Sequence, residues 1–80
     1  MSFSDLPVAS GRKHVKAFQL AGWSVRNRKG GSHINLIHPT IPFVLTVPDH
    51  DTVSKGTLQA LVRKADLTTE QYREVFDKAN

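Results

Sequence analysis

The chain has 80 residues, no cysteine, and eleven Lys/Arg against seven Asp/Glu, which gives a formal net charge of +4. This length predicts one domain over residues 1–80, because it leaves no room for a second core. The lack of cysteine excludes disulfides and thiolate metal sites, and no apolar run is long enough to span a bilayer, so we expect a cytoplasmic protein without a membrane segment.

A helix followed by a hairpin is predicted in the first half of the chain. Ser10 fits an N-cap, and apolar residues recur at helical spacing over 11–21 until a glycine ends the pattern. Alternation from Trp23 onward predicts a first strand. The pair Gly30-Gly31 is typical of a turn and leads into a second strand over about 32–38.

A third strand and two helices are predicted in the second half. Phe43, Leu45 and Val47 alternate with polar or smaller residues until Pro48 ends the strand. Polar residues 49–53 form a loop. A second helix follows, with the strongest periodic signal in the chain at its apolar positions, which are Leu58, Leu61, Val62 and Ala65.

Capping residues define where these two helices begin. Ser54 or Thr57 fits the N-cap of the second helix. Thr68 with Gln71 forms a capping box for a short C-terminal helix. The order is α-β-β-β-α with a terminal helix, so we predict an α+β fold in which helices cover one face of a three-stranded antiparallel sheet.

His33 is the candidate catalytic residue. If Ile34 and Leu36 face the core, strand alternation turns His33 outward, next to a basic segment. Histidine titrates near neutrality and can act as a base. A base that takes the 2′-hydroxyl proton of RNA allows the RNA to be cleaved without a metal ion, if cations stabilise the phosphorane. A surface or capping histidine is the alternative that spacing alone leaves open.

The residues around His33 are candidate phosphate ligands. Residues 1–38 hold six Lys/Arg and one acid, a net +5, whereas residues 39–80 hold five and six, a net −1. A basic half favours a nucleic-acid backbone or an acidic protein partner over a neutral metabolite. The predicted RNA- or phosphate-binding residues are Arg26, Arg28, Lys29, Gly30, Gly31, Ser32 and, at the start of the second helix, Lys55. For the glycines the alternative is a plain turn, for Lys55 it is ordinary capping of the helix, and for the basic residues it is a solvated surface.

The other histidines are weaker candidates. His50 lies in the loop after the third strand and is a candidate second acid/base, although Asp49 and Asp51 beside it also fit a solvated loop. For His38 a structural role is favoured, and His14 is expected on the exposed face of the first helix. No zinc or EF-hand spacing is present, so we expect neither a metal site nor a cofactor. The large aromatic residues, Phe43 among them, fall at core periodicities, which gives little support to base stacking.

Several short motifs occur in one order from about residue 10 to 72. Ser10-Gly11 opens a helix that ends Phe18-Gln19-Leu20-Ala21-Gly22-Trp23, and Gly31-Ser32-His33 follows the basic segment. The later motifs are His38-Pro39, Val47-Pro48-x-His50 and Lys55-Gly56-Thr57-Leu58 running to Ala65-Asp66-Leu67-Thr68. In this order and spacing they resemble the HicA family of toxin ribonucleases.

The resemblance implies a fold like that of double-stranded-RNA-binding domains and an mRNA endonuclease that blocks translation. It makes the histidine of Gly-Ser-His, here His33, the catalytic residue, and it implies a cognate HicB-like antitoxin as protein partner. Many members carry a second histidine or a basic residue where this chain has Ile34. This difference leaves the general acid unassigned and makes His50 a more interesting candidate for that role. A non-catalytic RNA-binding module of the same fold, or an inactive relative that acts mainly through an antitoxin-like partner, are the alternatives.

Overall fold

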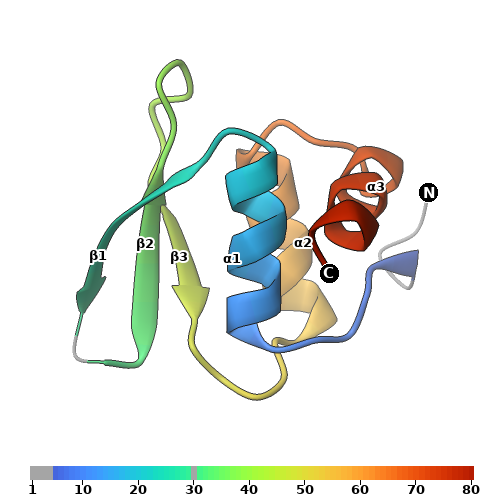
Figure 1. Ribbon diagram of the computed structural model, residues 1–80, viewed down its shortest axis with the longest axis horizontal. Helices are drawn as coiled ribbons and strands as arrows, with labels where there is room; N and C mark the ends of the chain where they lie inside the picture. Colours follow the sequence, from blue (N-terminus) through green and yellow to red (C-terminus); the bar gives the residue numbers. More distant parts are fainter. Residues whose placement is uncertain (1–4, 30) are drawn as a thin grey trace.

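The chain forms an antiparallel sheet and a group of helices, in the order helix, three strands, two helices (Figure 1). The computed structural model describes residues 5–29 and 31–80. Within them the elements are α1 (Gly11–Leu20), β1 (Ser24–Lys29), β2 (His33–Ile37), β3 (Leu45–Pro48), α2 (Lys55–Lys64) and α3 (Thr69–Ala79). The predicted α+β class and element order are confirmed.

Side-chain caps fix where the helices begin. The hydroxyl of Ser10 accepts a hydrogen bond from a backbone N–H in the first turn of α1. Ser54, rather than Thr57, caps α2 in the same way. Thr68 and Gln71 form the predicted capping box of α3, in which each side chain accepts from the other's backbone N–H. Each cap satisfies backbone donors that would otherwise lack a partner.

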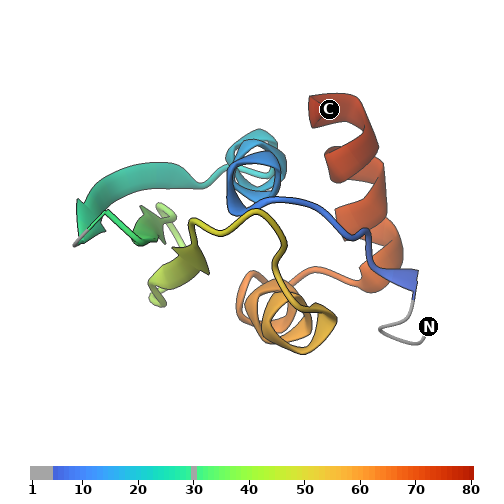
Figure 2. The same ribbon diagram turned by 90° about the horizontal axis from the view of Figure 1, so that it is seen from below.

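The sheet has one covered and one open face. Its strand order is β1-β2-β3, with Ile34 opposite Val47 and Leu36 opposite Leu45, and all four side chains are at most 2% exposed. Both α1 and α2 lie on the side of these residues, as Figure 2 shows. Because side chains alternate along a strand, the intervening residues of β2, which include His33, face away from the helices.

The C-terminal helix α3 packs on α1 and lies on the far side of the helices from the sheet (Figure 2). The rings of Phe18 and Tyr72 have centroids 4.9 Å apart, and both side chains are fully buried. At the end of α3 the amide of Asn80 donates to the backbone oxygen of Lys13 at 3.1 Å. The helix thus completes the core without covering the strands.

The prediction for Phe43 was wrong. Pairing with β2 begins only at Leu45, so Phe43 precedes the ladder and is 53% exposed instead of joining the core. The alternation of Leu45 and Val47 was correct, but it does not extend back to Phe43, which lies outside the ladder.

The prediction for His14 was also wrong, because this side chain is fully buried. His14 lies four residues before Phe18, so both point from the same face of α1 toward α3. Its Nδ1 is 2.6 Å from the hydroxyl oxygen of Tyr72, and its Nε2 has no hydrogen-bond partner among the described residues. Desolvation by burial lowers the pKa of His14 to about 4.

This burial predicts a pH-dependent stability. The unfolded chain takes up a proton on His14 near pH 6.5, whereas the folded chain does so only near pH 4. The free energy of unfolding should therefore fall as the pH drops through this window, by about 3–4 kcal/mol in total, because each pKa unit corresponds to about 1.4 kcal/mol. Urea denaturation of the wild type and of His14→Leu at several pH values in the window measures this. An equal decline in both proteins would assign the titration to another group.

Candidate functional site

Several polar and backbone groups that favour anions gather at one end of the molecule. The turn between β1 and β2, the end of β3, and the first turns of α1 and α2 all lie at this end (Figure 1). The first turn of a helix carries unpaired N–H groups and the positive end of the helix dipole. A negatively charged ligand is therefore favoured here before any side-chain charge is considered.

His33 begins β2 at this end and is exposed on the open face of the sheet. In the ladder it lies opposite Lys29 of β1 and Pro48 of β3. Its Nδ1 is 3.2 Å from the hydroxyl oxygen of Ser32. A hydroxyl thus holds one ring nitrogen of His33, and the predicted outward orientation is confirmed.

Asp49 joins two arginines from different elements next to this position. Its Oδ1 accepts from Nε of Arg12, on α1, at 3.3 Å, and its Oδ2 pairs with Nη2 of Arg28, on β1. Its backbone N–H donates to the carbonyl of Ser32 at 2.9 Å, which links the group to the turn before His33. The hydrogen bond from Arg12, followed by the charges of both guanidinium groups, lowers the pKa of Asp49. The carboxylate therefore stays ionised, and the three side chains carry a net charge of +1.

Gly11 allows α1 to start against the end of β3. Its N–H donates to the carbonyl of His50 at 2.9 Å. A Cβ on this residue would lie 1.9 Å from the carbonyl oxygen of Pro48, a distance that no side chain tolerates. This close approach places Arg12, the next residue, beside Asp49.

The predicted phosphate ligands of the hairpin have different positions. Arg26 is exposed and lies at a bulge, where the pairing of β1 with β2 skips one residue. Lys29 is the last residue of β1. Gly31 adopts a positive φ of 76°, which suits glycine in the turn, and Gly30 lies outside the described residues. Arg28 lies opposite the buried Ile34 in the ladder, on the side of the sheet where it pairs with Asp49, and is still 45% exposed.

The two remaining candidates lie after β3. His50 is exposed and follows Pro48 by two residues, so the backbone brings it to the same end of the sheet as His33. The described residues show no hydrogen bond between the two imidazoles. Lys55 is the first residue of α2 and is half-buried. Its role in phosphate binding stays a prediction.

A row of polar side chains crosses the open face of the sheet, and sequence reasoning did not predict it. We call Asn27, Asn35 and Thr46 the polar row. They lie directly opposite one another on β1, β2 and β3. The hydroxyl of Thr46 donates to Oδ1 of Asn35 at 2.8 Å, and Nδ2 of Asn35 donates to Oδ1 of Asn27 at 2.7 Å. Asn35 is two residues from His33 on the same strand, so the row and the imidazole share one face.

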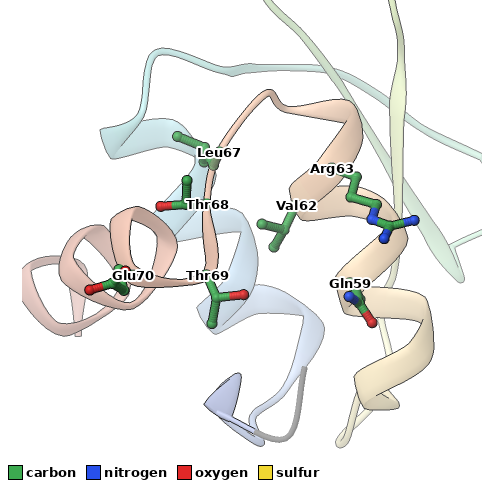
Figure 3. A pocket seen from close by; sticks show the side chains of 7 residues that line it. All are labelled: Gln59, Val62, Arg63, Leu67, Thr68, Thr69 and Glu70. Atoms are coloured by element: carbon green, nitrogen blue, oxygen red, sulfur yellow. The ribbon is translucent and has the colours of Figure 1, made fainter. Parts of the chain in front are cut away.

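The pocket at α2 and α3 is separate from this site. A pocket of about 310 Å³ lies between α2 and the start of α3 (Figure 3), and its lining includes Val62, Arg63 and Leu67 but no residue of the strands. Among residues 5–29 and 31–80, no three His, Asp or Glu side chains gather as a metal-binding group. Across those same residues, every helix falls short of the length and apolarity needed to cross a membrane.

Comparison with known proteins identifies the family. A scan against protein-family models matches residues 11–67 to the HicA toxin of bacterial toxin–antitoxin systems. The chain belongs to the HicA family. HicA proteins are toxins, and as a class they are ribonucleases that have RNA as substrate and an antitoxin as partner. No curated protein matches the chain.

The matched segment runs from the start of α1 to just beyond α2. It therefore contains His33, Asp49 and both arginines of the ion-pair group. Helix α3 lies outside it, although Tyr72 on this helix is part of the core. In this HicA chain the candidate site is thus built entirely within the family segment.

The close approach at Gly11 predicts that this HicA chain does not tolerate a side chain there. Alanine normally favours a helix over glycine by about 1 kcal/mol. Because its Cβ would overlap the carbonyl of Pro48, Gly11→Ala should instead lower the free energy of unfolding by about 1–3 kcal/mol. Gly56→Ala is the matched control, since a Cβ at that helical position meets nothing within 4 Å. Urea denaturation of both variants checks this, and equal stability of the two would contradict the close approach.

Proposed function

We propose that the chain is the toxin of a type II toxin–antitoxin pair and acts as a metal-independent endoribonuclease that cleaves mRNA. The observation that carries the proposal is the exposed imidazole of His33, which begins β2 at the end of the sheet where the Arg12–Asp49–Arg28 group lies, within the segment that matches HicA. A cytoplasmic HicB-like antitoxin is the proposed protein partner, and blocked translation is the proposed consequence.

In the proposed reaction His33 is the general base. Because Ser32 can hold Nδ1–H, Nε2 keeps a free lone pair that takes the proton of a 2′-hydroxyl. The 2′-oxygen then forms a bond to the adjacent phosphorus, and the bond from phosphorus to the 5′-oxygen breaks. The products are a 2′,3′-cyclic phosphate and a 5′-hydroxyl, so the reaction needs the 2′-hydroxyl that distinguishes RNA from DNA.

Two further groups complete the proposed site. The phosphorane formed in this reaction carries additional negative charge. The guanidinium groups of Arg28 and Arg12, which Asp49 holds at this end of the sheet, are the candidate groups that stabilise it. The leaving 5′-oxygen needs a proton. His50, at the same end of the sheet, is the candidate acid.

Loss of His33 should abolish toxicity while the fold persists. Induced expression of the wild type should arrest growth, and His33→Ala should restore it, because loss of a general base lowers cleavage by about 10²–10⁴-fold. Purified wild type should cleave RNA in the presence of a chelator and leave 2′,3′-cyclic phosphate ends. Circular dichroism verifies that the variant is folded. Full cleavage by His33→Ala would remove His33 from the mechanism, and RNA binding by a wild type that yields no product would favour a non-catalytic module.

Arg28 should contribute more to cleavage than an equally charged residue elsewhere. Arg28→Ala should lower the cleavage rate about 10–100-fold and reduce the dependence of binding on salt by about one phosphate contact. Arg63→Ala is the matched control, since this arginine lies on α2 at the separate pocket. Cleavage rates over a series of salt concentrations give both quantities. Equal effects of the two substitutions would indicate a general charge effect.

A further inference from the structure

We propose that the polar row on the open face of the sheet binds a base of single-stranded RNA next to the scissile phosphate. The inference rests on the proposed function for the nature of the ligand. It assigns a binding role to Asn27, Asn35 and Thr46, whose side chains are uncharged and contain no titratable atom.

The row is held in a fixed arrangement before any ligand arrives. Two hydrogen bonds of 2.7 and 2.8 Å run in one direction across three strands, from Thr46 through Asn35 to Asn27. Each side chain comes from a different strand at the same level of the ladder. Ordered side chains lose little conformational freedom on binding, which favours affinity.

The row retains hydrogen-bonding capacity on the face that is open to solvent. Among the hydrogen bonds of the described residues, it uses one N–H of Asn35 and neither N–H of Asn27. The oxygen of Thr46 can still accept. Amide and hydroxyl groups with both donors and acceptors suit the edges of nucleic-acid bases.

The position of the row relative to His33 favours a base over a phosphate. Asn35 is two residues along β2 from His33, about 6–7 Å away, on the same face. This separation is comparable to the reach of one nucleotide when its phosphate lies at His33. The charged groups that suit phosphate, on Arg28 and Arg12, lie at the His33 end of the sheet, and Arg28 is opposite Ile34 on the covered side.

Beyond the row the same face becomes apolar. Ile37, the last residue of β2, is 42% exposed, and Val44, just before β3 and two residues from Thr46, is 38% exposed. A base has a polar edge and an apolar face, and single-stranded RNA is recognised by both features together. Along β2 the open face thus presents, in order, the imidazole of His33, a polar row for a base edge, and an apolar surface for stacking.

The test measures RNA binding without cleavage. A fluorescently labelled, short single-stranded oligoribonucleotide of mixed sequence is titrated with His33→Ala protein, and fluorescence anisotropy gives Kd. Adding Asn35→Ala should weaken binding about tenfold, the order expected when a side chain that contacts a base edge in two places is lost. Adding Gln19→Ala, an exposed amide on α1, should leave Kd unchanged. In the otherwise wild-type protein, Asn35→Ala should also raise KM or shift the cleavage positions with little change in kcat.

Cross-strand pairs also stabilise a sheet, so folding must be checked separately. Circular dichroism and urea denaturation report it, and Thr46→Val, which keeps the shape of the side chain, is the second variant if Asn35→Ala is unstable. An unchanged Kd in a folded variant overturns the inference, whether or not the protein cleaves RNA. A weakened Kd with no cleavage by the wild type supports the inference and overturns the proposed function.

Discussion

The burial of Ile34 and Leu36 against the helices is the constraint on which the candidate site depends. Both side chains are almost completely removed from water, opposite equally buried residues of β3. A slip of one residue in this strand would expose these two apolar side chains and bury an imidazole and an amide, at a cost of several kcal/mol. The register of β2 therefore fixes His33 and Asn35 on the open face. The alternation of side chains along β2 therefore determines both the buried core and the residues of the candidate site.

The charged side chains at this end of the sheet are held in place by an ion-pair group. Asp49, which follows β3, holds Arg12 of α1 and Arg28 of β1, which are 37 and 21 residues away from it in the sequence. Exposed ion pairs contribute little to stability, so the value of this group lies in the placement of the guanidinium groups. Gly11 has a comparable role, since only a residue without a side chain lets α1 begin where Arg12 reaches the carboxylate.

Local patterns in the sequence were sufficient for the order of elements, the caps and the outward position of His33. The periodicity of α2 and the capping box of α3 depend on neighbouring residues alone, and the structure confirms both. The misplacement of His14 has a local cause, because its spacing of four from Phe18 indicates burial despite its polarity. Phe43 was misplaced because alternation does not reveal where pairing starts.

The remainder of the site depends on contacts between distant segments. Asp49 and Arg12 are 37 residues apart, and the polar row needs the register of three strands. No local signal specifies either. The bulge at Arg26 adds a second difficulty, because simple alternation from Val25 would turn Asn27 toward the helices.

That bulge has a consequence for how the sheet can vary. The extra residue resets the parity of β1, so Asn27 lies opposite Asn35 while Val25 lies opposite Leu36. Without the bulge, a β1 of the same length would place Arg26 opposite Asn35 and Asn27 opposite Ile34, on the covered side, with no change in β2 or β3. The bulge thus decides which side chain of β1 lies beside Asn35 on the open face, independently of the imidazole on β2.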